Sequence, residues 1–112
     1  MQELNGKVAV VTGSYKGIGY AVLKGLAPLF HGHIYMTARN PELGQKALEA
    51  LKAEVGEEDA SKLRFHQLDI TDDASVDALK SHIVNEYGGI DLLVNNAAIA
   101  FKVSLCFISA NL

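Results

Sequence analysis

The sequence has 112 residues, enough for one domain but few for a parallel sheet with helices on both faces. Hydrophobic residues make up 49% of it and charged residues 21%, which fits a globular protein and argues against disorder. A formal net charge of −3 gives no reason to expect a nucleic-acid partner, and without an apolar run of bilayer length no membrane partner is expected. The single cysteine and the lack of an apolar signal-peptide segment favour the cytoplasm.

The first strand is predicted at about 7–11, and a glycine-rich run follows it directly: Thr12-Gly13-Ser14-Tyr15-Lys16-Gly17-Ile18-Gly19. Because glycine has no Cβ, these glycines can turn the chain off a strand end, admit a phosphate to the main chain and let the next helix pack closely. The free N–H groups at the start of that helix would face the pyrophosphate of a dinucleotide. The alternative is a glycine-rich turn without a ligand, which the order strand, loop, helix disfavours.

The first helix is predicted over about 18–29, with Gly32 as its C-terminal cap. The apolar residues that recur at helical spacing in it are Ile18, Val22, Leu26 and Leu29. A second strand at about 34–37 leads to Asn40-Pro41, where Asn is the expected N-cap and Pro the first helical residue.

The second helix carries small and apolar residues along one face, namely Gly44, Leu48, Leu51 and Val55. The acidic run at 56–59 is predicted to be a solvated loop rather than a metal site. A third strand at about 63–68 precedes Asp69-Ile70, and either Thr71 or Asp72 can cap the next helix.

The third helix repeats its apolar residues at Val76, Leu79, Ile83 and Tyr87. Gly88-Gly89 ends it, and a fourth strand at about 90–94 leads to Asn95-Asn96. The order β-α-β-α-β-α-β predicts a Rossmann-type doubly wound α/β fold with strand order 3-2-1-4. Right-handed crossovers would place the first two helices on one face of the sheet and the third on the other.

Cofactor identity is predicted from the end of the second strand. An acidic residue there prefers the ribose 2′-hydroxyl of NAD, whereas a 2′-phosphate calls for arginine. The strand ends Thr37-Ala38-Arg39, no carboxylate precedes Glu42, and Lys16 can approach the same phosphate because the first strand is next to the second. These two cations favour NADP(H); the alternative is that both are ordinary surface charges.

The glycine run, together with Asn95-Asn96-Ala97 after the fourth strand, resembles the TGxxxGxG and NNAG motifs of short-chain dehydrogenases/reductases. The stretches at 65–70, 86–91 and 99–103 are more similar still to the NADPH-dependent carbonyl reductases of that superfamily. The resemblance covers about 7–103, which implies an NADP(H)-binding half-domain at 1–103 and a divergent apolar tail at 104–112.

The resemblance also implies roles for individual residues. The residues expected around the pyrophosphate and the adenosine ribose are Gly13, Ser14, Tyr15, Lys16, Gly17, Ile18 and Gly19. Arg39 would join Lys16 at the 2′-phosphate, while Asp69 accepts from the adenine amino group and Ile70 packs on the ring. Asn96 would lie near the inner ribose and help to hold the fourth strand. A simple strand-to-turn cap at Asn95-Asn96 is an alternative that is compatible with this role.

Two departures from the family pattern affect the expected activity. Ala98 stands where the NNAG motif has glycine, and the sequence after Val103 is unlike the family's continuation. The family's catalytic serine, tyrosine and lysine belong to the second half. The one YxxxK match, Tyr20 to Lys24, follows the phosphate loop at the wrong end of the cofactor and lacks an upstream serine, so we assign no catalytic residue.

Three hypotheses remain at this stage. In the first, the sequence is the cofactor-binding portion of an NADPH-dependent carbonyl reductase whose catalytic half is missing, and it is inactive alone. In the second, it is a non-catalytic NADP(H)-binding or interaction module that associates through an open sheet edge. In the third, it is a truncated isoform without function. A metal site is not expected, because the four histidines are spread over different predicted elements.

Overall fold

The computed structural model describes residues 7–96. Strands and helices alternate along them as the apolar periodicity predicts. In chain order they are β1 (Val8–Val11), α1 (Gly17–Leu26), β2 (His33–Ala38), α2 (Pro41–Glu54), α3 (Glu57–Ala60), β3 (Leu63–Gln67), α4 (Asp73–Tyr87) and β4 (Leu92–Val94). The predicted tail and Ala98 lie outside the described residues. No helix within 7–96 has the length and apolar character to cross a membrane.

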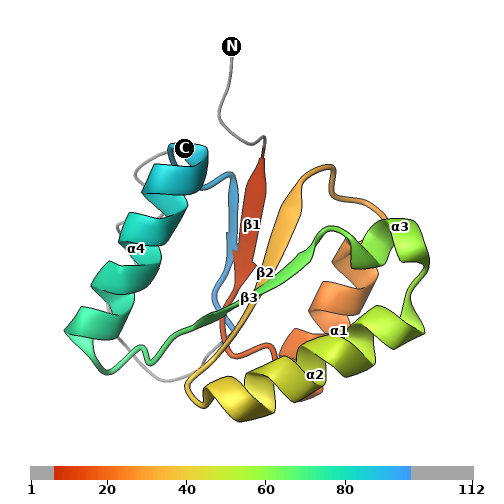
Figure 1. Cartoon of the computed structure of the whole chain (residues 1–112), viewed down its shortest axis with the longest axis horizontal. Helices are drawn as coiled ribbons and strands as arrows, with labels where there is room; N and C mark the ends of the chain where they lie inside the picture. Colours follow the sequence, from red (N-terminus) through yellow and green to blue (C-terminus); the bar gives the residue numbers. More distant parts are fainter. Residues whose placement is uncertain (1–6, 97–112) are drawn as a thin grey trace.

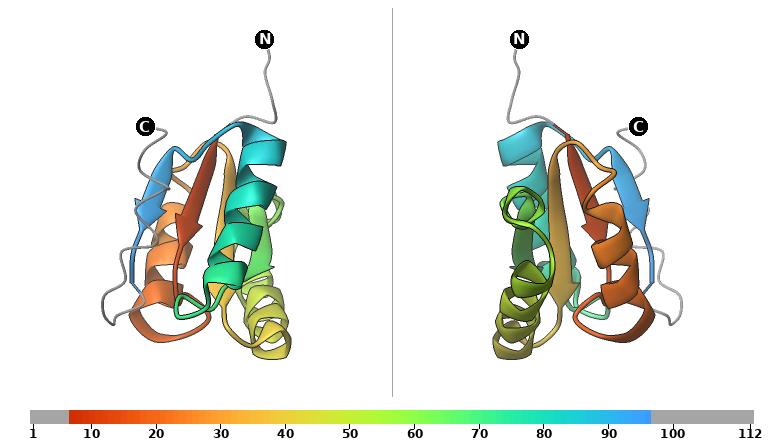
Figure 2. Two further views of the ribbon diagram at one scale, coloured as in Figure 1. Left: turned by 90° about the vertical axis from the view of Figure 1, so that its left-hand side faces the viewer. Right: turned by 90° about the vertical axis from the view of Figure 1, so that its right-hand side faces the viewer.

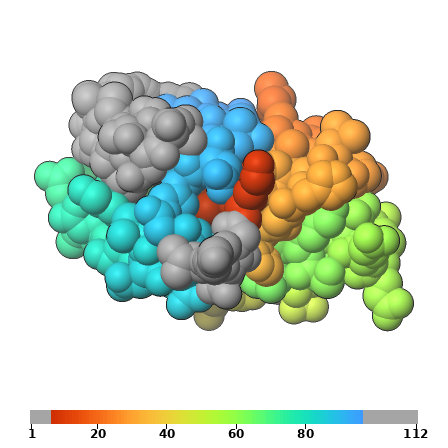
Figure 3. All heavy atoms as spheres, turned by 90° about the horizontal axis from the view of Figure 1, so that it is seen from above, coloured from red at the N-terminus to blue at the C-terminus, as the bar shows by residue number. Residues whose placement is uncertain are grey.

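The four strands form one parallel sheet in the order β3-β2-β1-β4, which confirms the predicted topology. β1 lies in the middle, with Val10 opposite Tyr35 of β2 and Leu93 of β4. Figure 3 looks onto the amino ends of the strands and shows the start of β1 between the segments that contain β4 and β2. All four residues of β1 are fully buried, as expected of a central strand covered on both faces.

Helices cover both faces of the sheet, with α1 and α2 on one face and α4 on the other, as predicted (Figure 1). Figure 2 shows α4 in front of the sheet in one view and α1 and α2 in front in the opposite view. The buried residues of the α1 and α2 face are Ala9, Val11, Leu23, Ala27, Ile34, Met36, Leu48, Leu51 and Leu63. Those of the α4 face are Val8, Val10, Tyr35, Leu68, Val76, Leu79, Ile83 and Ile90.

The buried side of α1 differs from the predicted one. The helix ends at Leu26, and its inward residues are Gly19 and Leu23, followed by Ala27 at the C-cap. Ile18 and Leu29 are instead 75% and 73% exposed. Val22 and Leu26, the other two predicted residues, are partly buried and pack against the core of this face. Small residues one turn before and after Leu23 let the centre of the helix face approach the sheet closely.

The prediction that Gly32 caps α1 is wrong, because the cap is Ala27 in a right-handed helical conformation. Gly32 serves a different contact: a Cβ at this position would collide with the carbonyl group of Lys7. The neighbouring His33 N–H donates to that carbonyl oxygen at 2.9 Å. The glycine therefore allows the chain entering β2 to pass close to the chain entering β1.

The helices after β2 begin and end largely where the sequence indicates. Asn40 caps α2 as predicted, and Asp72 rather than Thr71 caps α4 by accepting from the Ala74 N–H at 3.0 Å. Gly88 ends α4 in the left-handed conformation with φ 84°. The acidic run predicted as a loop forms the short helix α3, because carboxylates in a first helical turn interact favourably with the backbone dipole.

Candidate functional site

The glycine-rich loop leaves the carboxyl end of β1 and enters α1 at the edge where β2 and β4 also end (Figure 1). In open parallel sheets this edge, beside the central strand, is the usual place for ligands. Gly13 and Gly17 have φ of 60° and 65°, a left-handed conformation that glycine adopts without strain. The loop conformation therefore depends on glycine at both positions.

Gly19 has a packing role rather than a conformational one. A Cβ on it would lie 2.7 Å from both the Gly13 carbonyl oxygen and the Asn96 Nδ2, and 2.8 Å from the Ser14 Cα. The first turn of α1 thus rests directly on the loop that precedes it. Two of the predicted glycine roles, turning the chain and close packing of the helix, are seen at these positions, and the close approach of a phosphate to the main chain stays a prediction.

Buried hydroxyl groups anchor the loop, a feature that the motif reasoning missed. Thr12, Ser14 and Thr37 are 0% exposed. Thr37 Oγ1 accepts from the Gly13 N–H at 3.2 Å, and its carbonyl oxygen accepts from the Ser14 N–H at 3.1 Å. The N–H groups of Gly13 and Ser14 are therefore engaged within the protein. The signal in the sequence was a threonine between the apolar residues Met36 and Ala38 near the end of a strand.

The first turn of α1 differs from those of α2 and α4. Its N-cap residue, Lys16, is extended and makes no capping hydrogen bond through its side chain, among the residues that the structure describes. The first N–H groups of a helix have no partners within the helix, so this end offers donors to an anion. Lys16 is exposed, with its ammonium 5.4 Å from the centre of the Tyr15 ring. Ile18 is exposed in the same turn.

The second predicted cation, Arg39, is exposed immediately after β2. Its carbonyl oxygen accepts from Gln67 Nε2 at 3.2 Å, which links the ends of β2 and β3. Asp69 lies beyond β3, and its Oδ1 accepts from the Thr71 hydroxyl at 2.6 Å and from the Thr71 N–H at 3.0 Å. These hydrogen bonds, and to a lesser extent the Arg39 charge, lower the pKa of Asp69. Ile70 is partly buried against the α4 face.

Asn96 fastens the end of β4 to the loop. Its N–H donates to Thr12 Oγ1 at 2.9 Å, and its Nδ2 donates to the Gly13 carbonyl oxygen at 3.2 Å. The Thr12 N–H in turn donates to the Val94 carbonyl oxygen at 3.0 Å. The predicted role of Asn96 in holding the fourth strand matches this geometry, and its proximity to a cofactor ribose stays a prediction.

Tyr20 and Lys24, the YxxxK match, lie on α1 and face the end of α2. Burial raises the pKa of Tyr20, and the charge of Glu54 and a hydrogen bond to it raise the pKa further. Lys24 Nζ lies 3.2 Å from Glu54 Oε1. A phenol that acts as a general acid near neutral pH needs its pKa lowered, so this environment opposes catalysis. The pair instead connects α1 to α2.

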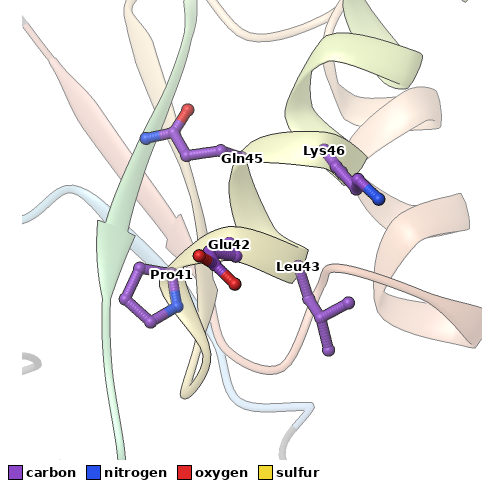
Figure 4. Close-up of a pocket in the computed structure, with 5 residues that line it drawn as sticks. All are labelled: Pro41, Glu42, Leu43, Gln45 and Lys46. Carbon is purple, nitrogen blue, oxygen red and sulfur yellow. The ribbon is translucent and has the colours of Figure 1, made fainter.

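A depression of about 470 Å³ lies beside the start of α2. Its lining within residues 7–96 is Pro41, Glu42, Leu43, Gln45 and Lys46. Figure 4 shows these side chains projecting from the first two turns of the helix, with Leu43 and Lys46 on one side. It adjoins Arg39 along the chain, and none of its residues was among those predicted for the site.

Histidines from different elements meet on the α4 face, away from the glycine loop. Tyr35 Oη lies 2.9 Å from His82 Nε2 and 3.0 Å from Tyr87 Oη, and the His66 and His82 ring centres are 5.1 Å apart. No sequence pattern indicates this cluster, because its members are far apart in the chain. Within the described residues, no group of three or more metal-binding side chains is present.

Comparison with known proteins agrees with this geometry. The family model described as short chain dehydrogenase matches residues 7–110. Carbonyl reductase (NADPH) 1 from Macaca fascicularis is 50% identical over 98 residues, which cover 88% of this chain and 34% of that protein. Carbonyl reductase (NADPH) 3 from Mus musculus is 45% identical over 97 residues, which cover 87% of this chain and 33% of that protein. The chain thus spans about a third of the length of the curated relatives it matches.

Solved structures of reductases share the fold of this chain. Menthone neomenthol reductase from Mentha piperita superposes with a TM-score of 0.76 at 40% identity, over 83% of this chain and 32% of that one. The N-domain of a bacterial malonyl-CoA reductase with NADP has a TM-score of 0.74 at 37% identity, over 85% of this chain and 17% of that one. With its Rossmann-type sheet, its glycine loop and the family match over most of its length, this chain belongs to the short-chain dehydrogenase family.

Proposed function

We propose that this chain is the NADP(H)-binding portion of a carbonyl reductase whose complete form transfers hydride from NADPH to ketone, aldehyde or quinone carbonyls. The observation that carries the proposal is the uncapped first turn of α1 behind a glycine loop, with Lys16 at its entrance. The carbonyl reductase relatives support the same cofactor and reaction class. Bound NADPH supplies the hydride; the residues described here bind and orient it.

The pyrophosphate is assigned to the start of α1. Since the N–H groups of Gly13 and Ser14 bond to Thr37, the donors offered to a phosphate are those of Gly17, Ile18 and Gly19. The first turn of α1 holds no acidic residue that would repel an anion. Gly13, Ser14, Tyr15 and Asn96 then shape the loop around the bound cofactor.

The 2′-phosphate is assigned to Lys16 and Arg39. The loop bonds directly to Thr37, two residues before Arg39, so both cations belong to the same edge of the sheet. An aspartate is ionised at neutral pH, so the Asp69 carboxylate can accept from the adenine amino group. Both of its hydrogen bonds to Thr71 use Oδ1, so we assign the adenine contact to Oδ2.

The polypeptide of 112 residues is proposed to have no carbonyl reductase turnover of its own, because no described side chain provides the proton donor. NADPH oxidation with a quinone or an aldehyde, above a blank and abolished by Tyr20→Phe, would contradict this assignment. A cytoplasmic location and self-association are further proposals. The latter is supported by β4, an edge strand of the described sheet whose three residues are partly exposed.

A titration with NADPH and NADH tests the proposal. The chain should bind NADPH at least about tenfold more tightly than NADH, since each charge-assisted contact to the 2′-phosphate contributes roughly 1.5–3 kcal/mol. Lys16→Ala and Arg39→Ala should weaken NADPH binding about tenfold each and leave NADH nearly unchanged. Lys52→Ala, at the far end of α2, makes the same charge change and should alter neither. Equal affinities for the two cofactors would overturn the roles of Lys16 and Arg39.

A further inference from the structure

Thr37 is a polar residue at the carboxyl end of the buried strand β2. It is 0% exposed and lies between two apolar residues, Met36 and Ala38. A buried hydroxyl without partners would destabilise the fold, so its hydrogen bonds indicate why it is tolerated there. Those bonds all lead to the end of β1 and to the glycine loop.

Both the backbone and the side chain of Thr37 engage the loop. Its carbonyl oxygen accepts from the Ser14 N–H at 3.1 Å, and its own N–H donates to Ser14 Oγ at 3.2 Å. Its Oγ1 accepts from the Gly13 N–H at 3.2 Å and donates to the Val11 carbonyl oxygen at 3.3 Å. One residue of β2 thus fixes two consecutive residues of the loop.

Ser14 completes this arrangement. Its Oγ donates to the Val11 carbonyl oxygen at 2.8 Å while it accepts from the Thr37 N–H. Each hydroxyl therefore donates its single hydrogen and accepts one bond, which leaves both side chains satisfied in the interior. The regular pairing of β1 with β2 ends at Val11 and Met36, and the two hydroxyls continue the bonding where the backbone turns at Gly13.

The position of the loop determines where the first turn of α1 points. Gly19 in that turn already lies within contact distance of Gly13 and Ser14, with room for no Cβ between them. A shift of Gly13 therefore has to move the start of α1. Phosphate recognition by backbone N–H groups depends on short, directed hydrogen bonds, so such a shift weakens it.

We propose that Thr37, with Ser14 as its partner, is a positioning residue that holds the Gly13 turn so that the N–H groups at the start of α1 are preset for a pyrophosphate. Thr37 itself touches no cofactor in this scheme. The inference rests on the proposed NADP(H) binding and adds to it the element that prepares the phosphate site before the ligand arrives.

The test compares two changes at Thr37 with a neighbouring control. Thr37→Val keeps the shape and removes the hydroxyl, whereas Thr37→Ser keeps the hydroxyl. Met36→Leu, the adjacent fully buried residue on the opposite face, perturbs the strand without touching the loop bonds. The probes are NADPH and adenosine 2′-monophosphate, which lacks the pyrophosphate.

Thr37→Val should weaken NADPH binding about fivefold or more, the equivalent of one lost hydrogen bond, and change the affinity for adenosine 2′-monophosphate less than about twofold. Thr37→Ser should bind like the wild type. The Gly13 amide should exchange its hydrogen at least about tenfold faster in Thr37→Val, while Met36→Leu leaves that amide protected. If Thr37→Val does not fold, Ser14→Ala is measured in its place, with the same expected pattern.

Unchanged NADPH affinity in folded Thr37→Val would overturn the positioning role, as would equal losses for both probes. Losses matched by Met36→Leu would overturn it too, because they would reflect general destabilisation. Failure of the wild-type chain to bind NADPH at all would instead overturn the proposed function. The wild-type titration therefore separates the two failures.

Discussion

The N-termini of α1 and α2 have the same backbone setting but differ in how their first N–H groups are capped. Both helices follow a strand of the sheet, and both have an extended N-cap residue, Lys16 for α1 and Asn40 for α2. Asn40 Oδ1 accepts from the Glu42 N–H at 2.9 Å and from the Leu43 N–H at 3.2 Å. Lys16, by contrast, makes no such side-chain bond among the described residues, so the donors of α1 are left to another partner.

The two helix N-termini also differ in charge, and this difference too favours an anion at α1. Glu42 lies in the first turn of α2, where its carboxylate offsets the positive end of the helix dipole. The first turn of α1 has no acidic residue, and a lysine precedes it. The comparison shows that one helix start is stabilised internally, whereas the other keeps the features that attract an anion. Stability and binding should therefore respond to different substitutions at the two ends.

The largest effect is expected at Gly19. Gly19→Ala would place a Cβ 2.7 Å from the Gly13 carbonyl oxygen, a backbone atom that cannot move without shifting the loop. We expect the unfolding free energy to fall by about 1–3 kcal/mol, as for an overpacked interior. NADPH affinity should fall more than about tenfold, because the start of α1 moves. Chemical denaturation and a binding titration measure the two effects.

Gly25→Ala in the same helix is the matched control. Gly25 is exposed, and a Cβ added to it would meet nothing within 4 Å, so alanine should raise the unfolding free energy by about 0.5–1 kcal/mol through helix propensity. NADPH affinity should stay unchanged. If both substitutions weakened binding equally, the loss at Gly19 could not be assigned to its contact with the loop.

An intermediate effect is expected at the start of α2. Asn40→Ala removes the acceptor of two N–H groups and should lower the unfolding free energy by about 1 kcal/mol. Asn40→Asp keeps an acceptor and should recover most of that loss. Asn40→Ala leaves Arg39 in place, so NADPH affinity should change little, whereas Lys16→Ala should lower it. A large loss of affinity in Asn40→Ala, without a loss of stability, would mean that α2 also binds the cofactor.

The sequence was sufficient for the architecture and for features that depend on local chemistry. The strand order follows from alternating periodicity and the handedness of crossovers, and Asn40 with Pro41 marks a helix start through its own backbone. The predicted buried side of α1 was wrong for Ile18 and Leu29, whereas Val22 and Leu26 are partly buried against the core. The centre of the buried side is Leu23 with Gly19 and Ala27, and these two small residues give little hydrophobic signal although they pack closely. Long-range packing therefore overrode a local pattern.

In the candidate site, too, some features could be predicted from the sequence and others could not. Its glycines and cations could be located from motif and spacing, but the bonds of Thr37 to Ser14 join residues from different strands and loops. A single threonine in a strand does not reveal which loop it will meet. The histidine cluster was missed for the same reason, since His66 and His82 meet only in the folded chain.

The smallest effect that we expect is a pH dependence of stability, and it should come from the α4 face rather than from either helix start. The donors at α1 are backbone N–H groups and the cap of α2 is an amide, so neither titrates near neutral pH. On the α4 face, burial lowers the pKa of His82 below its ordinary value of 6.5, and the charge of His66 lowers it further, while Glu86 opposes them. Burial also lowers the pKa of His33.

A histidine whose pKa is lower in the folded state binds fewer protons there than in the unfolded chain. Its contribution to stability is therefore complete above the unfolded pKa of 6.5 and is lost as the pH falls through the lower folded pKa. Denaturation of the ligand-free chain on either side of the ordinary histidine pKa, at about pH 7.5 and 5.5, should show lower stability in acid. His82→Gln should reduce that difference, whereas His31→Gln, at an exposed position, should preserve it. An acid loss that His82→Gln leaves intact would place the titrating group elsewhere, and His33, whose pKa burial also lowers, would then be the next residue to substitute.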